Sequence, residues 1–398
     1  MIYEMSKEQL EAVEKLKKLK VGALFMETGT GKTMTALQLF NDRFQANKTN
    51  HLIWLAPLNT KDNFWKEVKK YDFENLPITF YGIESIRQSG RIFLEVLNLA
   101  KELETSFIVL DESLKIKNYV QVSQRIIKIG RYCKYRLILN GTLISKNFLD
   151  LYNQLDFLSP KILNMSFLEF RNRFTDEIIV KKNGRELKRF VSDNANEEAL
   201  FKMIDNYIYR CELVLNLERE YVKYYYDYFE KEEEYNKIKD RMLDDLERGG
   251  FHFLEYAQKL QSIYAVTEDK KKVFEEILKE YPKCIVFCKF IESQEYLKEK
   301  YPNILVLSYQ KHSFGLNLQE YNVIVFWDKT FDYATVEQAE ARIFRIGQTK
   351  SCTYIRMQCD CGLDKMIAGN ICKKGNMLEN LKIEFMKQIE ERKKASLT

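Results

Sequence analysis

Two short stretches carry residue types that handle phosphate. The first, METGTGKT, spans Met26–Thr33 and stands between an apolar run and a helical pattern. Gly29 and Gly31 allow the backbone N–H groups to curl inward around a phosphate, and the new helix adds its positive N-terminal end. In such a loop Lys32 reaches the β- and γ-phosphates and Thr33 ligates Mg²⁺. The other loop residues expected to contact the nucleotide are Thr28 and Thr30.

An acidic pair supplies the second half of such a site. The apolar run FIVL is followed directly by Asp111 and Glu112. Asp111 is suited to hold Mg²⁺ through water, and Glu112 to polarise the attacking water as general base. A further run, LILNGT, ends at Thr142 in small polar residues suited to sensing the γ-phosphate. Together these residues predict a site that binds a nucleotide with Mg²⁺ and hydrolyses it.

A third stretch, VEQAEARIFRIGQTK, holds Gln338, Arg342 and Arg345, spaced four and then three residues apart. On a helix this spacing places all three side chains on one face. The residues suited to begin and end this helix are Asp332 or Thr335 and Gly347. The spacing alone leaves open a solvated, salt-bridged face and a functional stripe.

The elements that must position these residues follow an α/β pattern. Apolar, strand-like runs alternate with helical patterns at 21–26, 51–57, 106–112 and 135–142, and again at 283–289, 303–308, 322–328 and 352–357. Strands separated by helices predict parallel sheets with helices on both faces. We therefore expect one lobe at 1–160, a second at 266–398 that ends in a helix at 373–398, and a charged, helical region at 161–265 between them. Within that region, 229–248 predicts a protruding helix because its apolar positions are sparse.

Composition bounds the class of protein. The chain has 398 residues, of which 45% are hydrophobic and 30% charged, so it can bury more than one core. A net charge of +5 (63 Lys and Arg against 58 Asp and Glu) is compatible with a polyanionic partner but does not argue for one. No run approaches the ~20 apolar residues of a membrane span, and the charged start lacks a signal-peptide centre. We therefore expect a cytoplasmic protein with reduced thiols.

The cysteines raise the question of a zinc site. Four of the eight lie close together in the sequence: Cys352, Cys359, Cys361 and Cys372. Their pairs lack the two-residue gap usual in structural zinc sites, so we expect no zinc cluster.

The order of the motifs resembles that of superfamily-two helicases, and within them the Swi/Snf-like ATP-dependent DNA translocases. The stretches that carry the resemblance cover most of the chain: METGTGKT (26–33), WLAP (54–57), DESLKIKN (111–118), LNGTLISKNFLDLYNQLDFLSP (139–160), SFGLNLQEYNVIVFWD (313–328) and EQAEARIFRIGQTK (337–350). The RIGQ run at 345–348 is the most family-specific of them. The resemblance implies two RecA-like lobes, each a parallel sheet flanked by helices, with helical insertions between them and ATP bound between the lobes.

The resemblance also assigns roles to residues. Arg342 and Arg345 would be arginine fingers that reach the γ-phosphate, since the guanidinium fork is always charged and binds phosphate oxygens bidentately. Gln338 would help to position the water or the phosphate. Gln9 resembles the glutamine that reads adenine upstream of the first motif. DNA contacts, made to the backbone without reading bases, would come from Asn59, Thr60, Lys61, Thr142, Ser308 and Asn317.

The chain departs from the family pattern in places. Leu114 stands where a histidine commonly follows the acidic pair, and that histidine bridges the ATP and DNA sites in relatives, so coupling is expected to run differently here. His312 and Ser313 replace a usual pair of glycines. The small size and the composition rich in Lys, Ile, Asn and Tyr favour a minimal motor from a phage or mobile element.

Three functions stay open. The first is an ATP-driven translocase on double-stranded DNA, and the second is a strand-separating DNA helicase of replication or recombination that uses 161–265 as a wedge. The third is a nucleotide-gated DNA-binding module whose turnover is disabled by the loss of the histidine. RNA fits the motif series less well.

Overall fold

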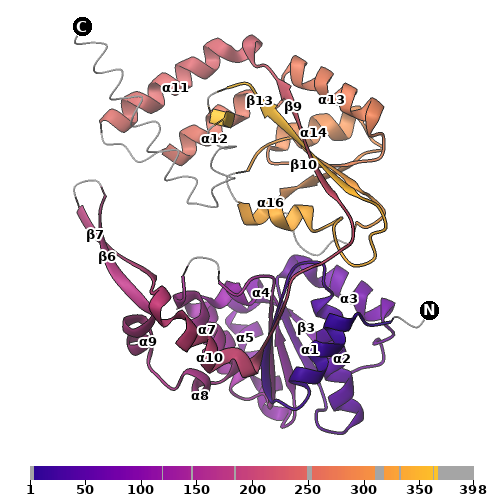
Figure 1. Cartoon of the computed structure of the whole chain (residues 1–398), viewed down its shortest axis with the longest axis vertical. Helices are drawn as coiled ribbons and strands as arrows, with labels where there is room; N and C mark the ends of the chain where they lie inside the picture. The colour runs from indigo at the N-terminus through magenta and orange to yellow at the C-terminus, as the bar shows by residue number, and fades with distance from the viewer. Residues whose placement is uncertain are drawn as a thin grey trace. The chain divides into compact units, whose positions relative to one another are not determined.

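A computed structural model describes residues 4–118, 120–144, 147–182, 185–248, 253–309, 318–330, 333–361 and 363–365. The chain divides into two compact units, Met1–Val214 and Leu215–Thr398, each built around its own sheet (Figure 1). No helix among these residues is both long and apolar enough to cross a membrane.

Unit 1 is a six-stranded, wholly parallel sheet in the order β3-β2-β4-β5-β1-β8. Its strands are β1 (Val21–Met26), β2 (Leu52–Ala56), β3 (Ile78–Gly82), β4 (Phe107–Leu110), β5 (Tyr135–Asn140) and β8 (Ile208–Cys211). The helices are α1 (Lys7–Leu16), α2 (Lys32–Gln45), α3 (Lys61–Lys70), α4 (Ile83–Gln88), α5 (Gly90–Glu102), α6 (Gln121–Gly130), α7 (Leu149–Leu158), α8 (Pro160–Leu163), α9 (Phe167–Phe174) and α10 (Glu197–Ile204). Short 3₁₀ turns lie at η1 (Leu58–Thr60), η2 (Ser113–Ile116), η3 (Asn194–Asn196) and η4 (Asp205–Tyr207), and β6 (Thr175–Lys182) pairs with β7 (Arg185–Ser192) as an antiparallel hairpin.

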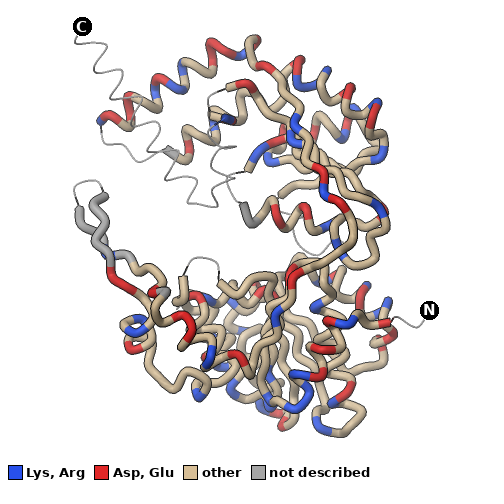
Figure 2. The backbone as a smooth tube through the Cα atoms, viewed as in Figure 1, with Lys and Arg blue, Asp and Glu red and all other residues tan. Residues whose placement is uncertain are grey.

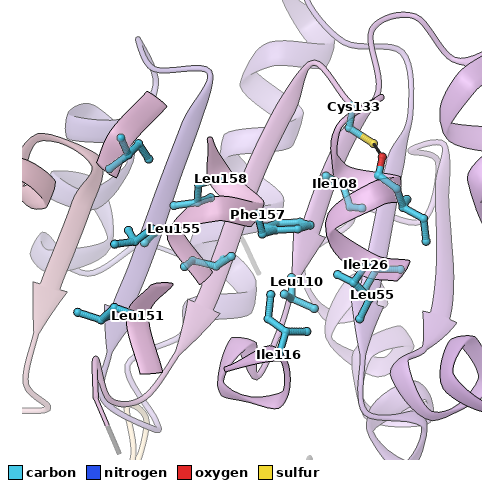
Figure 3. Packing of buried hydrophobic residues seen from close by; sticks show 14 of the residues in the cluster. Leu55, Ile108, Leu110, Ile116, Ile126, Cys133, Leu151, Leu155, Phe157 and Leu158 are labelled. Carbon is cyan, nitrogen blue, oxygen red and sulfur yellow. Dashed lines mark hydrogen bonds between the residues drawn. The ribbon is translucent and has the colours of Figure 1, made fainter. Parts of the chain in front are cut away.

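Both faces of this sheet are buried because its inner strands are apolar on both sides. Alternate residues of β2 and β4 enter two separate cores: one core is shared with α1, α2 and α3, and the other with helices from α4 to α10. Figure 3 shows part of the second core, where side chains of α6 and α7 gather with those of the strands, and where the Cys133 thiol donates to the carbonyl of Ile129 at 3.8 Å. Helices therefore cover both faces of the sheet, so the positions available for function are those that follow the ends of its strands.

Unit 2 is a five-stranded, wholly parallel sheet in the order β11-β10-β12-β13-β9. Its strands are β9 (Arg219–Tyr226), β10 (Ile285–Cys288), β11 (Leu305–Ser308), β12 (Val323–Phe326) and β13 (Cys352–Cys359). Its helices are η5 (Phe229–Lys231), α11 (Glu232–Glu247), α12 (Phe253–Ile263), α13 (Glu268–Glu280), α14 (Ile291–Lys300) and α16 (Tyr333–Glu340). One core packs α11 to α14 against the sheet.

The predicted fold class is confirmed, and all eight apolar runs form strands in the two parallel sheets. Three further sheet strands, β3, β8 and β9, were not predicted. The region 161–265, expected as a helical insertion, supplies the hairpin and one strand to each sheet: β8 joins unit 1 and β9 joins unit 2. The strand β9 escaped notice because Arg219, Glu220 and Lys223 interrupt its apolar pattern. The predicted C-terminal helix at 373–398 lies outside the described residues.

The prediction of a protruding helix at 229–248 is wrong. Helix α11 buries Tyr235, Met242, Leu243 and Leu246 in the core of unit 2. Four apolar residues on one face are enough to dock a helix whose other residues are charged. Figure 2 shows the same division elsewhere, with Lys, Arg, Asp and Glu along the helices and few of them on the inner strands.

A buried ion pair links α13 to the chain at the carboxyl end of β12 in unit 2. The Lys270 ammonium of α13 lies 3.1 Å from Asp328, which directly follows Trp327 at the end of β12. Their side chains are 1% and 3% exposed. Lys270 also donates to the carbonyl of Ala265, while the Asp328 carboxylate accepts from the backbone N–H of Lys289. Each charge is thus neutralised and hydrogen-bonded, as burial demands.

We predict that Lys270→Ala destabilises unit 2 by about 3–5 kcal/mol, because removing one partner leaves Asp328 as an uncompensated buried charge. The free energy of unfolding from urea denaturation measures this. The neighbouring Lys271→Ala is the matched control, since Lys271 pairs with Glu268, whose side chain is 66% exposed, and such surface pairs contribute about 0–1 kcal/mol. Equal losses in the two variants would contradict the assigned role of the buried pair.

Candidate nucleotide site

The loop between β1 and α2 has the shape that a phosphate requires. Gly29 and Gly31 adopt left-handed conformations with φ of 95° and 84°, which glycine reaches without steric cost. A side chain at Gly31 would also run into the amide of Gln9. The loop delivers the chain directly into α2, whose first two residues are Lys32 and Thr33. The loop therefore carries the positive end of a 14-residue helix.

Two side chains hold this loop in place. The Lys32 ammonium curls back and donates to the carbonyls of Met26 at 2.8 Å and Glu27 at 3.3 Å. The fully buried Gln9 donates to the carbonyl of Thr30 at 2.9 Å and caps α1 reciprocally with Ser6. Sequence reasoning assigned Gln9 to adenine; the structure places its amide against the phosphate loop, and adenine recognition stays a prediction.

The acidic pair lies beside the loop lysine. Asp111 follows β4, and its carboxylate accepts from the backbone N–H of Glu112 at 2.9 Å. Loss of hydration raises the pKa of Asp111 to about 7, helped by the nearby Glu112 charge and opposed by the Lys32 ammonium. A carboxylate and a hydroxyl are oxygen ligands of the kind that Mg²⁺ takes, so the donor set of Asp111 and Thr33 fits Mg²⁺ in its chemistry.

Glu112 stands in an unusual backbone conformation. Its φ of 53° and ψ of 51° lie in the left-handed region, which a glutamate rarely adopts. Such strain persists only where the surroundings enforce it. Here the contacts that hold the backbone come from α7, which binds η2, the turn directly after Glu112.

Two buried polar residues of α7, Asn153 and Gln154, bind the segment that follows the acidic pair. Ser113 donates to the Gln154 side chain at 2.5 Å, and Asn153 donates to the carbonyls of Ile116 and Lys117 at 3.1 Å. Sequence reasoning missed this network. The available signal was the pair Asn153–Gln154 inside an otherwise apolar stretch, since polar residues on a buried helix face need partners.

The loop after β5 adjoins the phosphate loop. Asn140, which ends β5, is buried, and its amide donates to the carbonyl of Thr142 at 2.5 Å. A Cβ added at Gly141 would lie 3.2 Å from the hydroxyl oxygen of Thr28. The LILNGT run therefore lies next to the phosphate loop, and Thr142 is exposed at the end of this run.

The candidate DNA-contact residues fall into two groups. Asn59 and Lys61 are exposed in the turn after β2, and Thr60 spends its hydroxyl on the carbonyl of Pro57 at 2.7 Å. With Thr142 they follow strands that point the same way, so they belong to one edge of the unit 1 sheet. Ser308 ends β11 and is only 6% exposed, which leaves it little surface for a phosphate. Asn317 lies outside the described residues, as do His312 and Ser313.

The helix predicted at 336–347 is shorter in the structure than the sequence pattern indicates. Helix α16 ends at Glu340, so Gln338 lies on it, whereas Arg342 and Arg345 lie in the turns that follow. Thr335 lies inside the helix and does not cap it, and Asp332 is outside the described residues. The expectation of one helical face for all three side chains is therefore wrong. Arg342 is 6% exposed, and Arg345 is half-buried.

Tertiary contacts override the helical period at Glu340. Its carboxylate binds Arg356 of β13 at 3.0 Å and accepts from the Tyr221 hydroxyl of β9 at 3.2 Å, while its carbonyl accepts from the Tyr354 hydroxyl. Burial raises the pKa of Glu340, and the Arg356 guanidinium opposes that rise. The end of the helix is thereby tied to the sheet.

Gln348, the last residue of RIGQ, holds the arginine turns from the other end. It is 8% exposed. Its amide nitrogen lies within hydrogen-bonding distance of the carbonyls of Gln319, Tyr321 and Ile343, and its oxygen accepts from the N–H groups of Thr349 and Lys350. The last residue of the RIGQ run therefore has a main-chain contact for each polar atom of its side chain. Gly347 precedes it with a φ of 97°.

The zinc question has a limited answer. Within the described part of the chain, no three His, Cys, Asp or Glu side chains gather into a group that could hold a metal. Cys352, Cys359 and Cys361 are buried free thiols there, and Cys372 lies outside the described residues.

Comparison with known proteins identifies this arrangement. The family model of the SNF2-related domain matches residues 78–295, more than half of the chain. The chain belongs to the SNF2-related domain family. A second model, that of the type III restriction enzyme res subunit, matches residues 2–113, which include the phosphate loop and the acidic pair. The SNF2-related family thus appears here in a chain of two units, each built on its own parallel sheet.

The relatives of this SNF2-related chain are distant. An uncharacterized ATP-dependent helicase of Mycoplasma pneumoniae is 22% identical over 84% of this chain. The mouse SWI/SNF-related matrix-associated actin-dependent regulator of chromatin subfamily A containing DEAD/H box 1 is 27% identical over 39% of it. The chain spans 38% and 17% of the lengths of these two relatives. The Sulfolobus solfataricus SWI2/SNF2 ATPase core in complex with dsDNA is 19% identical, with a TM-score of 0.47, over 96% of this chain and 95% of that one.

We predict that Lys32→Ala weakens ATP binding or abolishes turnover, because it removes the ammonium of the residue that directly follows Gly31 in the phosphate loop. Affinity for a fluorescent ATP analogue and steady-state phosphate release measure the two effects. Lys48→Ala, an exposed lysine beyond the end of α2, is the control. Survival of normal turnover in Lys32→Ala would contradict the assignment of the phosphate loop.

Proposed function

We propose that this chain is an ATP-driven translocase that moves along double-stranded DNA. The observation that carries the proposal is the convergence of the phosphate loop, the acidic pair and exposed polar turns on one edge of the unit 1 sheet. Lys32 lies within electrostatic range of Asp111, and the loop of Thr142 touches the loop of Thr28. A nucleotide bound there would lie at the same end of the sheet as Asn59 and Lys61.

The residues divide the hydrolysis between them. Thr33 and Asp111 would hold Mg²⁺, which supplies charge neutralisation on the phosphates when it is bound. Lys32 binds the phosphates, and Glu112 takes a proton from the attacking water. Arg342, Arg345 and Gln338 of unit 2 would complete the site when the lobes close, so that hydrolysis is linked to lobe movement.

DNA would be held by its backbone. Asn59, Lys61 and Thr142 offer an amide, an ammonium and a hydroxyl, which suit phosphate oxygens and carry no base code, and the Thr60 hydroxyl would join them by leaving the carbonyl of Pro57. Binding is therefore expected to be independent of sequence and to weaken steeply with salt. The proposal places the protein in the cytoplasm.

A second candidate, a strand-separating helicase, is favoured by one observation. The hairpin β6–β7 stands as a separate two-stranded sheet within the region 161–265 (Figure 1). Antiparallel hairpins of this kind can be placed at a duplex fork, where strands have to be parted.

Steady-state ATP hydrolysis tests the proposal when measured with no nucleic acid, with single-stranded DNA, with duplexes of increasing length and with RNA. Duplex stimulation that grows with length supports translocation. Preference for single strands, together with unwinding of a fluorescent forked duplex, supports the helicase instead. No stimulation by any nucleic acid, with ATP binding retained, would leave a nucleotide-gated binding module.

We predict that Arg345→Ala retains ATP binding but loses turnover by about 10³-fold or more, as expected for an arginine that stabilises the transferring phosphoryl group. Single-turnover hydrolysis with saturating duplex DNA measures the loss. Lys350→Ala removes an exposed charge from the same segment and serves as the control. Normal turnover in Arg345→Ala would show that this side chain belongs to the surface.

A further inference from the structure

Glu27 joins the phosphate loop to the chain that leaves unit 1. It is the first residue after β1, and its backbone N–H donates to the carbonyl of Cys211, the last residue of β8, at 3.0 Å. Its carboxylate accepts from the backbone N–H of Leu213 at 2.7 Å. A hydrogen bond to an ionised carboxylate is among the stronger ones in proteins. Both contacts lie within unit 1.

The bonded segment is where the chain crosses between the units. Between the end of β8 at Cys211 and the start of β9 at Arg219 lies the crossing segment, 212–218. Unit 1 ends at Val214, which is 88% exposed, whereas Leu213 is 9% exposed. The Glu27 carboxylate therefore anchors the last buried residue before the boundary and sets the direction in which the chain leaves.

The same residue receives the loop's own hydrogen bonds. The carbonyl of Glu27 accepts from the Thr30 hydroxyl at 2.7 Å, from the Thr30 N–H at 3.3 Å and from the Lys32 ammonium at 3.3 Å. When Lys32 turns its N–H groups toward a phosphate, the Glu27 peptide loses a charged donor. Glu27 thus bonds the phosphate loop through its carbonyl and Leu213 through its carboxylate.

We propose that Glu27 is a positioning residue that transmits the state of the phosphate loop to the crossing segment. The inference rests on the proposed ATP site in that loop. The proposed route runs from the phosphate loop through Glu27 and its hydrogen bond to the Leu213 N–H, and on to the unit boundary.

Hydrogen–deuterium exchange of the full chain tests this at the Leu213 amide, with and without a non-hydrolysable ATP analogue. In the wild type we expect the analogue to change Leu213 exchange. In Glu27→Ala we expect exchange about 10-fold faster without nucleotide, because a charge-assisted bond is lost, and no further response to the analogue. Affinity for the analogue should stay within about threefold of the wild type, and duplex-stimulated kcat should fall about tenfold or more.

Two variants make the result specific. Glu27→Gln keeps an acceptor oxygen without the charge, so it should fall between the wild type and Glu27→Ala, and it remains informative if the alanine variant does not fold. Glu11→Ala removes another carboxylate that binds near β8, through the Tyr209 hydroxyl at 3.1 Å, without touching the crossing segment, and it should behave as the wild type.

Other outcomes overturn the inference. Leu213 exchange that ignores the analogue in the wild type would show that no coupling exists, even with ATP hydrolysis intact. Loss of analogue binding in both Glu27 variants would reduce Glu27 to a residue that shapes the phosphate loop. A wild type that neither binds nor hydrolyses ATP would refute the proposed function first, and the inference with it.

Discussion

The parallel pairing of β1 is the constraint on which unit 1 depends. Because β1 lies between β5 and β8 and runs parallel to both, everything that follows these strands emerges at one edge. The phosphate loop, the Thr142 turn and the crossing segment are neighbours for this reason, although they are far apart in the sequence. The sheet can impose this only if both its faces are covered, which is why two separate cores are needed. Catalytic geometry here is a consequence of strand order.

Much of this could be predicted, and the failures share a cause. The inner strands are short apolar runs without charge, and the motifs at their ends have fixed chemistry, so strands and phosphate loop were found together. Three of the four edge strands of the two sheets, β3, β8 and β9, were not predicted; an edge strand such as β9 is solvated on one side and tolerates Arg219 and Lys223. The arginine turns had a helical period but not a helix, since Glu340 is drawn to Arg356 and Tyr221 across the sheet. Periodicity records which residues are buried locally; it does not record such distant partners.

The loop of the acidic pair shows how a departure from the family pattern is accommodated. Leu114, which stands where the Swi/Snf-like pattern predicts a histidine, lies in a loop that is firmly held, because Asn153 and Gln154 of α7 bind it. The strained backbone of Glu112 thus rests on buried amides whose partners are all within unit 1. The Glu27 contact is a separate link, which joins the phosphate loop to the crossing segment.

Gln348 gives the RIGQ signature a different meaning from the one its position suggests. A side-chain amide offers donors to carbonyls at one atom and an acceptor to N–H groups at another. Glutamate at this position would set a carboxylate against three backbone oxygens, and leucine would leave the same five backbone groups without this partner. The Gln348 amide therefore supplies hydrogen-bond partners to main-chain atoms of the surrounding turns. The role of Gln348 is therefore to shape the turns that present Arg342 and Arg345, and this role does not depend on any chemistry of the arginines themselves.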